Sequence, residues 1–347
     1  MTKEKAQMST KEKLEEIDLG TDPQKPRPIS INSKLSKEEK SELILLLKEF
    51  RDIFTWEYIE MPGLDLRLVV HTLNVELGAK PVAQPARVFH TNVEEQIRKE
   101  VQRLLAARFI KPIQHPRWLS NIVSMKKKNG QIWCCVDFRN LNRVCPKDEF
   151  LLPNMDLLID SASVNAIFSF MDKFSGYNQI WMALRDAKKT SFKTPIRNFY
   201  YTMMPFGLKN ASATYQHTMT AIFHHMMHRD IEDYVEDTMV KSRKRENHVK
   251  VLRKVFERCI LFKLRMNPLK FSFEVSAIKF LGFLVHSRGI DVDLAKATVI
   301  AIMKPLATIK ELKSFLGKVS YIRRFIPYLA SITLIFTKLL KKGQGFK

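Results

Sequence analysis

The sequence predicts an α+β fold with an antiparallel sheet, and three observations support this prediction. Hairpin signals occur twice, helix patterns open with capping boxes, and strands and helices alternate without a regular βαβ rhythm or an internal repeat. The chain has 347 residues, of which 45% are hydrophobic and 27% charged, values close to those of globular proteins. Its length is sufficient for two or three folded units, each with a core of its own.

The first 105 residues divide into two predicted segments. Residues 1–35 are polar, proline-containing and without periodicity, so we expect a disordered leader. Residues 36–105 predict an N-terminal helical and linker segment, because two capping boxes each precede apolar residues at helical spacing. The boxes are Ser36 with Glu39 and Thr91 with Glu94, followed respectively by Leu43, Leu46, Leu47 and Phe50, and by Ile97, Val101, Leu104 and Leu105.

Short strands are predicted in the middle of the chain. Residues 121–136 predict a hairpin, because apolar residues flank Asn129-Gly130, which favours a two-residue turn. Residues 167–171 predict a strand that ends at Asp172, and residues 199–204 predict another.

A helix with an apolar stripe follows the second of these strands, and it also carries His224 and His228. These histidines are four residues apart, a spacing that suits a metal site on a helix. No acidic third ligand has matching spacing, so we favour a solvated helix face.

The rest of the chain predicts a further strand pair, a hairpin and more helices. Residues 231–240 predict two strands around a turn that bears carboxylates, and residues 249–260 predict a basic helix. Residues 278–285 and Ile290 flank a second hairpin turn, and Thr308 with Glu311 opens the C-terminal helices.

The charge of the chain predicts a polyanionic partner. Lys and Arg number 58 against 36 Asp and Glu, so the formal charge is +22. Nucleic acid is the first candidate and an anionic membrane surface the second. The four cysteines form no CxxC pair, which excludes the usual zinc spacing. Without a signal peptide or a membrane span in the sequence, we expect an intracellular protein, cytoplasmic or alternatively nuclear.

Two acidic sites end otherwise apolar strands, at Asp172 and at Glu236-Asp237. Charge at the end of a buried strand is costly unless it is paired, capped or bound to metal. Converging carboxylates are what two-metal phosphoryl transfer requires, and their oxygen ligands favour Mg²⁺ or Mn²⁺. The alternative is a set of ordinary turn acids, since Asp is common in turns.

Ordered motifs in this chain resemble those of the reverse transcriptase of gypsy-type LTR retrotransposon Pol polyproteins. The motifs are K-K-K-N-G at 126–130, V-D-F-R-N-L-N at 136–142, S-F-M-D-K-F-S-G-Y-N-Q-I at 169–180, M-P-F-G-L-K-N-A at 204–211, Y-V-E-D at 234–237, N-P-L-K-F-S-F at 267–273 and F-L-G-F-L-V at 280–285. The resemblance covers roughly residues 40–347. It implies the right-hand polymerase fold of fingers, palm and thumb, with an antiparallel palm sheet.

The resemblance also implies roles for individual residues. Asp172 matches the first metal-binding aspartate, and Glu236 and Asp237 occupy the two acidic positions of the YxDD turn. The remaining matches are Lys126 on the incoming triphosphate, Tyr177 as the gate against a ribose 2′-hydroxyl, Phe206 and Gly207 in the nucleotide pocket, Lys270 as proton donor to the leaving pyrophosphate, Arg139 along the template, and Leu281, Gly282 and Phe283 as primer grip.

The domain boundaries implied by the resemblance are fingers and palm at 106–286 and thumb or connection helices at 287–347. Because the resemblance to the polymerase ends at Lys347, we expect a chain truncated before an RNase H domain.

Three departures from the family pattern bear on activity. Glu236 stands where the family has aspartate, and one added methylene moves a carboxylate by about 1.5 Å, against a catalytic tolerance of about 0.5 Å. Trp133 falls where relatives have a phosphate-contacting arginine. Asp233 replaces an apolar strand residue, and a buried unpaired acid is destabilising.

Two functions from different classes follow, together with a third alternative. The first is an RNA-directed DNA polymerase domain that uses Mg²⁺ or Mn²⁺, a template-primer of RNA or DNA, and deoxynucleoside triphosphates. The second is a catalytically inactive nucleic-acid-binding remnant that keeps the fold and the basic surface. The third is a decaying fragment of marginal stability. The sequence leaves the oligomeric state open.

Overall fold

The computed structural model describes residues 12–126, 132–172, 176–235, 237–303 and 305–340. Its centre is a six-stranded sheet in the order β1-β2-β13-β7-β12-β11. All neighbouring strands in it are antiparallel except the pair β2 and β13. The strands are β1 (Leu14–Asp18), β2 (Pro28–Asn32), β7 (Ile167–Asp172), β11 (Ile231–Tyr234), β12 (Asp237–Ser242) and β13 (Asn267–Val275).

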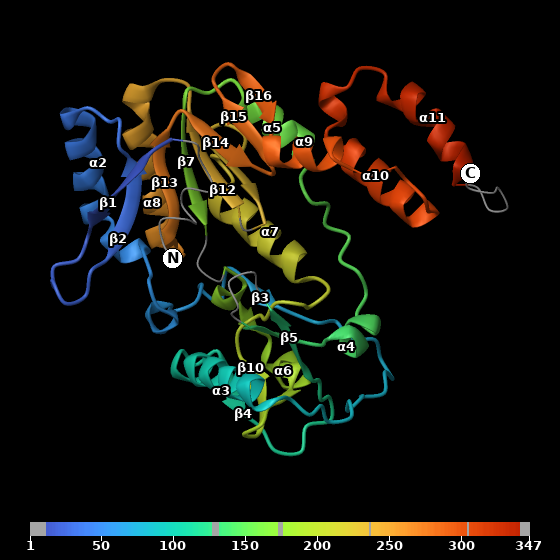
Figure 1. Ribbon diagram of the computed structural model, residues 1–347. Coiled ribbons are helices and arrows are strands. Elements are labelled where there is room, and N and C mark those ends of the chain that lie inside the picture. Colours follow the sequence, from blue (N-terminus) through green and yellow to red (C-terminus); the bar gives the residue numbers. More distant parts are fainter. Residues whose placement is uncertain (1–11, 127–131, 173–175, 236, 304, 341–347) are drawn as a thin grey trace.

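The expected disordered leader is wrong for residues 12–35, which supply the first two strands of this sheet (Figure 1). Ile29 and Ile31 of β2 are fully buried, and the side-chain amide of Asn32 donates to the Glu274 carbonyl at 3.0 Å. The sequence did not indicate this short strand, because its flanks are polar and contain proline. Its partner β13 lies some 240 residues away in the chain. Residues 1–11 lie outside the described residues.

Helices cover both faces of the central sheet. On one face α7 (Ala211–Phe223) and α8 (His248–Leu261) pack on β11 and β12, and α2 (Lys37–Glu49) packs on α8. The opposite face carries α5 (Met155–Ala162) and a smaller sheet. That smaller sheet consists of β14 (Ala277–Phe280), β15 (Phe283–His286) and β16 (Gly289–Val292).

A separate lobe lies below the central sheet in Figure 1. Its largest element, α3, packs against β4 and β6, so the expected boundary between residues 105 and 106 falls inside one packed unit. The elements of this lower lobe are α3 (Thr91–Ala106), β4 (Ile110–Pro112), β5 (Ile122–Lys126), β6 (Ile132–Val136), α4 (Arg139–Arg143), α6 (Leu184–Ala187), β9 (Phe192–Lys193) and β10 (Asn198–Tyr201), with β3 (Val70–His71) and β8 (Trp181–Met182) paired at its top.

The C-terminal helices extend away from the sheet at the upper right of Figure 1. They are α9 (Leu294–Ala301), α10 (Ile309–Tyr321) and α11 (Leu329–Leu339). Six short 3₁₀ helices complete the described elements: η1 (Arg51–Ile53), η2 (Tyr58–Glu60), η3 (Gly176–Gln179), η4 (Lys188–Thr190), η5 (Arg245–Asn247) and η6 (Arg323–Phe325). None of the helices in the described ranges is both long and apolar enough to cross a membrane.

The predicted helix starts are confirmed at α2 and α10 and wrong in detail at α3. Ser36 with Glu39 and Thr308 with Glu311 form capping boxes, in which each side chain bonds the other residue's backbone N–H. At α3 the N-cap is His90, and Thr91 is already the first helical residue.

The strand predictions are confirmed with three adjustments. The first hairpin pairs β5 with β6, although Asn129-Gly130 lies outside the described residues. The expected strand 199–204 is shorter, because β10 ends at Tyr201. The expected strand 278–285 is two strands, since Leu281 and Gly282 have φ of 49° and 88° and turn the chain.

His224 and His228 do not share a helix face, because α7 ends at Phe223. The Nδ1 atom of His228 instead lies 2.9 Å from Oε2 of Glu232. Within the described residues, no cluster of three or more His, Cys, Asp or Glu side chains is placed to hold a metal ion.

Candidate active site

The two predicted aspartates lie directly opposite each other in the central sheet. Asp172 ends β7, Asp237 begins β12, and these two residues are register partners of the antiparallel pair. The row continues on both sides, because Asn267 of β13 pairs with Asp172 and Tyr234 of β11 pairs with Asp237. Directly opposed residues of an antiparallel pair point to the same face, with Cβ atoms about 4.5–5.5 Å apart. The pairing therefore assigns the two residues to the same face of the sheet.

Apolar side chains occupy the neighbouring positions of that face. Alternation along the strands puts Phe168, Phe170 and Met239 on the same face, and these three side chains are buried against α5 and the smaller sheet. Asp237 is half-buried. The side chain of Asp172 and the whole of Glu236 lie outside the described residues.

The turn between β11 and β12 is held by a buried amide of α7. The backbone N–H of Val235 donates to Oε1 of Gln216 at 2.7 Å, and Nε2 of Gln216 donates to the Asp233 carbonyl at 3.0 Å. Asp233 is fully buried, and the Thr238 hydroxyl donates to its Oδ1. The expectation that Asp233 is buried is confirmed, but the expectation that it lacks a partner is wrong.

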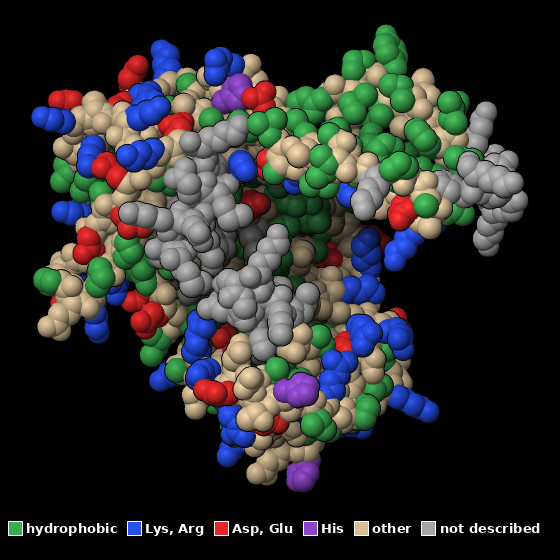
Figure 2. Space-filling model, viewed as in Figure 1, with side chains coloured by type: hydrophobic (Ala, Val, Ile, Leu, Met, Phe, Trp, Pro, Cys, Tyr) green, Lys and Arg blue, Asp and Glu red, His purple; other side chains and the backbone are tan. Residues whose placement is uncertain are grey.

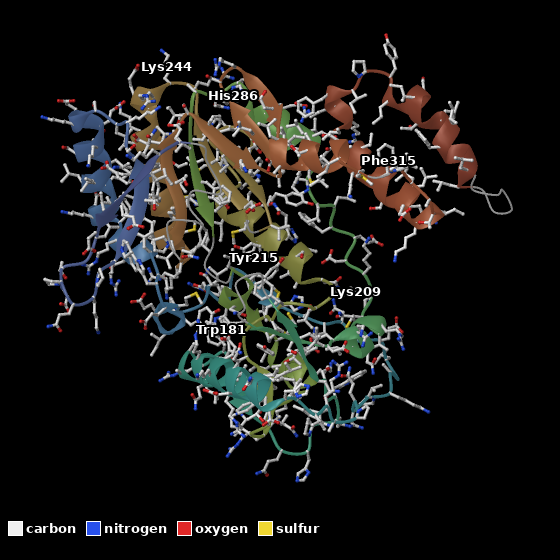
Figure 3. The ribbon with its side chains drawn as sticks, in the orientation of Figure 1. Trp181, Lys209, Tyr215, Lys244, His286 and Phe315 are labelled. Atoms are coloured by element: carbon white, nitrogen blue, oxygen red, sulfur yellow. The ribbon has the colours of Figure 1, made fainter. Side chains whose placement is uncertain are left out.

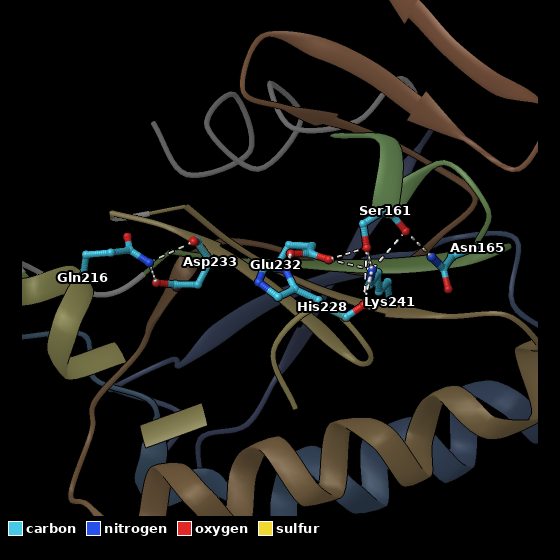
Figure 4. A network of polar contacts seen from close by, with 7 residues as sticks. All are labelled: Ser161, Asn165, Gln216, His228, Glu232, Asp233 and Lys241. Carbon is cyan, nitrogen blue, oxygen red and sulfur yellow. Dashed lines mark hydrogen bonds and ion pairs between the residues drawn. The ribbon is translucent and has the colours of Figure 1, made fainter. Parts of the chain in front are cut away.

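A buried ion pair occupies the other end of the same two strands (Figure 4). Nζ of Lys241 lies 2.7 Å from Oε1 of Glu232, and their side chains are 2% and 0% exposed. The Ser161 hydroxyl also donates to Glu232, at 2.7 Å, and Lys241 donates to the Ser161 and His228 carbonyls. These hydrogen bonds compensate two charges that would otherwise be costly to bury.

Tyr177 is packed between α7 and the Pro205–Gly207 turn. Its hydroxyl lies 2.9 Å from Oγ of Ser212, and its ring meets the Phe206 ring edge-on at 4.6 Å between centroids. Tyr215 contacts it from the next turn of α7, at 5.2 Å, between the central sheet and the lower lobe (Figure 3). The structure thus brings together Tyr177 and Phe206, which the resemblance assigns to one nucleotide pocket.

Gly207 makes the sharp turn after Phe206 possible. Its φ is +92°, in the region that favours glycine. The side-chain amide of Asn142 donates to the Gly207 carbonyl at 2.7 Å and accepts from the Lys209 N–H at 2.9 Å. Asn142 belongs to α4, so this bond ties the turn to the segment that carries Arg139.

Two exposed arginines share one buried carboxylate beside that turn. Nε and Nη2 of Arg139 donate to the Asp137 oxygens at 2.8 and 2.7 Å, and Nη2 of Arg87 lies 3.9 Å from Oδ2. The hydrogen bonds from Arg139 lower the pKa of Asp137. One negative charge against two positive ones leaves this surface cationic, and the same residues line a cleft of about 390 Å³ together with Gly207.

Comparison with known proteins relates the central part of the chain to a family. Residues 125–285 match the family model described as reverse transcriptase (RNA-dependent DNA polymerase). This segment is a reverse transcriptase domain. It contains the opposed aspartates, Tyr177 and the Phe206-Gly207 turn.

The similarity to known proteins extends beyond the reverse transcriptase domain. The chain is 30% identical over 326 residues to the retrovirus-related Pol polyprotein from transposon opus of Drosophila melanogaster, covering 90% of this chain and 32% of that protein. It is 29% identical to the Pol polyprotein from transposon 297 of the same organism, covering 89% and 29% respectively. The chain therefore spans about a third of the length of these relatives.

Two solved structures share the fold. A foamy viral protease-reverse transcriptase in complex with double-stranded DNA superposes with a TM-score of 0.79 at 20% identity, covering 90% of this chain and 54% of that one. The same viral protein in complex with an RNA/DNA hybrid gives 0.76 at 20% identity, covering 92% and 45%. The predicted α+β right-hand polymerase fold is confirmed.

Three sequence-predicted residues of the reverse transcriptase domain are placed by their backbone alone. Lys126 ends β5, Trp133 lies in β6 opposite Met125, and Lys270 lies in β13. Their side chains lie outside the described residues.

The predicted primer grip is the turn between β14 and β15. Leu281 and Gly282 form the turn, and the Phe283 ring stacks on the Tyr321 ring of α10 at 4.8 Å and 14°. Tyr321 crowds Gly282 so closely that a Cβ there would lie 2.0 Å from its hydroxyl oxygen. The turn is thereby attached to the C-terminal helices.

Sequence reasoning missed Gln216, Arg87 and Asn142 as parts of the site. Each acts through a partner at least 17 residues distant, so its neighbours in the chain do not reveal the contact, although Asn142 ends the V-D-F-R-N-L-N motif. For Gln216 one signal was present, because a fully buried Asp233 requires a hydrogen-bond donor from a neighbouring element.

Proposed function

We propose that this reverse transcriptase domain is an RNA-directed DNA polymerase, which joins a deoxynucleotide to the 3′-hydroxyl of a primer on an RNA or DNA template. The register pairing of Asp172 with Asp237 at the end of the sheet core is the observation that carries the proposal. Support comes from the formal charge of +22, which suits a nucleic-acid partner, and from similar folds solved in complex with DNA and with an RNA/DNA hybrid.

The donor set fits divalent cations. Asp172 and Asp237 offer carboxylate oxygens from adjacent strands, and the neighbouring Glu236 offers a third carboxylate, the ligand type that Mg²⁺ and Mn²⁺ prefer. Such ions, when bound, supply charge stabilisation for the attacking and leaving oxygens of phosphoryl transfer.

The chain's own residues position the substrates. The Tyr177 ring, held by Ser212 and Phe206, forms a fixed wall that a ribose 2′-hydroxyl would meet. Arg139 and Arg87 present positive charge along the template path. Lys126 binds the triphosphate and Lys270 donates the proton to pyrophosphate, as the resemblance implies.

The regions of the fold take the corresponding roles in this proposal. The central sheet is the palm, the lower lobe is the fingers and residues 287–347 are the thumb, while the turn at Leu281, Gly282 and Phe283 grips the primer. In Figure 2 the molecule is hollowed between the lower lobe and the parts above it, where a duplex would lie. The cytoplasmic location predicted from the sequence goes with this role.

Glu236 and Trp133 lower the rate in this proposal. The longer side chain of Glu236 misplaces one carboxylate, and a misplacement of about 1 Å is worth about 100-fold in rate. Trp133 removes a guanidinium that relatives offer to phosphate.

The test is primer extension on a primed RNA template, first with Mg²⁺ and then with Mn²⁺. We expect Glu236→Asp to raise the rate about 100-fold, with a further gain when Trp133→Arg is added. Asp172→Ala in that background should abolish extension, whereas Asp291→Ala, an exposed acid of β16, should not. Extension that survives Asp172→Ala would contradict the site assignment.

The second candidate function is binding of nucleic acid without catalysis. The same two departures, Glu236 and Trp133, favour it. It predicts salt-sensitive binding of a primer-template duplex and no extension by the parent chain with either metal ion.

A further inference from the structure

The turn that carries Glu236 and Asp237 contains a residue in a conformation that its type rarely adopts. Val235 has φ of +55°, in the left-handed region where its Cβ crowds the following carbonyl oxygen. A β-branched residue keeps such a conformation only when its surroundings hold it there. Whatever holds Val235 therefore also influences the position of Asp237, two residues further on.

Gln216 is the side chain that bonds Val235. Its Oε1 accepts the Val235 N–H at 2.7 Å, while its Nε2 donates to the Asp233 carbonyl at 3.0 Å and lies 3.4 Å from Oδ2 of the same residue. Gln216 is fully buried. The Gln216 amide thus bonds the backbone of Asp233 and of Val235, the residues on either side of Tyr234. It uses its donor for the first and its acceptor for the second.

The helix that supplies Gln216 also holds the nucleotide pocket. Ser212 lies four residues earlier in α7, so the two side chains share a helix face. Ser212 bonds the Tyr177 hydroxyl, and Gln216 bonds the turn. One rigid helix therefore connects the predicted ribose gate with the carboxylates.

We propose that Gln216 is a positioning residue for the acidic turn, which fixes Asp237 relative to the nucleotide pocket. Asp233 assists, because its carbonyl and carboxylate accept from Gln216 and its carboxylate also accepts from Thr238 on the opposite strand. The kinetic part of this proposal rests on the proposed polymerase function, whereas the structural part does not.

The test compares the two ends of one hairpin. Gln216→Met keeps the length of the side chain but removes both bonds to the turn. Ser161→Ala is the matched control, because Ser161 bonds buried Glu232 at the far end of the same two strands (Figure 4). If Gln216→Met does not fold, Gln216→Asn keeps the amide but shortens its reach.

The first measurement is hydrogen exchange of the peptide 231–238, which needs no activity. We expect exchange at Val235 to become about tenfold faster in Gln216→Met and to stay unchanged in Ser161→Ala. Equal exchange at Val235 in the parent chain and in the Gln216 variants would overturn the proposal.

The second measurement is steady-state primer extension in the Glu236→Asp background. We expect Gln216→Met to lower kcat about 10- to 100-fold, with the KM for the deoxynucleotide changed by less than about twofold, because the turn moves while the nucleotide pocket stays. Ser161→Ala should leave both constants unchanged. An unchanged kcat alongside faster exchange would overturn the positioning role. Absence of extension in the Glu236→Asp parent would instead count against the polymerase function, with the exchange result still deciding whether Gln216 holds the turn.

Discussion

The central sheet and the C-terminal helices are stabilised in different ways. The sheet buries a continuous core on both faces, and its internal polar groups, such as the Glu232–Lys241 pair, have hydrogen-bond partners. Within the described part of residues 294–340, Leu312 and Val319 are the buried side chains, and α9 has none. Figure 2 shows hydrophobic side chains gathered on the surface of α10 and α11.

The contact between the two regions is small and specific. Tyr321 of α10 stacks on Phe283 of β15, and the ion pairs Arg323–Asp156 and Arg324–Asp160 join η6 to α5. Exposed ion pairs contribute about 0–1 kcal/mol each. The sheet holds its geometry through its own core. The C-terminal helices are attached through Phe283 and two ion pairs to α5, so we expect them to open first.

The largest expected effect is on the central sheet. Lys241→Ala leaves the fully buried Glu232 without its cation, which should lower the free energy of unfolding by about 3–5 kcal/mol. Urea denaturation followed by circular dichroism measures it. Lys244→Ala, an exposed lysine two residues beyond the end of β12, is the control and should change stability by less than about 0.5 kcal/mol. A loss below about 1 kcal/mol for Lys241→Ala would show that the pair contributes little.

The stability of the sheet should also depend on pH through Glu274. Burial raises the pKa of this carboxyl to about 7, so the folded state holds its proton more tightly than the unfolded state. The proton on Glu274 therefore stabilises the folded state fully below pH 4.5. As the pH rises through 7 this contribution is lost, and the free energy of unfolding falls by about 3 kcal/mol. Burial lowers the pKa of His248 to about 3, and its contribution is lost in the opposite direction, as the pH falls below 6.5.

Comparison with Glu274→Gln isolates the carboxyl, since His248 is common to both chains. The difference in unfolding free energy between parent and variant should change between pH 5 and pH 8 and favour the variant at pH 8. A difference that is constant with pH would contradict the raised pKa.

The smallest expected effect is on the C-terminal helices. Leu312→Ala removes a fully buried side chain from α10 and should destabilise that region by about 2 kcal/mol. Because the region has a small separate core, hydrogen exchange should accelerate in α9, α10 and α11 but not in β7 or β12. Leu334→Ala, on the exposed surface of α11, is the control. Equal acceleration in β7 would show that the two regions unfold as one unit.

Local patterns predicted much of the fold and some of the site. The capping boxes at Ser36 and Thr308, the strand that ends at Asp172 and the strand pair around residues 234–237 were all predicted and confirmed. Each depends on residues close together in the chain, where periodicity and capping act. The ordered motifs predicted the reverse transcriptase domain for the same reason, since each motif is contiguous.

Other features required the tertiary structure. The strand β2 is stabilised by β13, some 240 residues away, and its own short polar context resembles a flexible segment. The Leu281-Gly282 turn lies within an apolar run that predicts one continuous strand. The contact of Gly282 with Tyr321 comes from a distant part of the chain, so the run itself does not indicate the turn.

The acidic turn depends on both local sequence and tertiary contacts. The sequence alone specified which residues bear the carboxylates and that they lie where strands meet turns, because strand propensity and turn chemistry are local. Folding decided that Asp172 and Asp237 are register partners, that Asp233 has hydrogen-bond donors and that Gln216 holds Val235. The first contact follows from pairing of β7 with β12 and the last from the burial of α7 against the sheet, and both bring together residues that are distant in the chain.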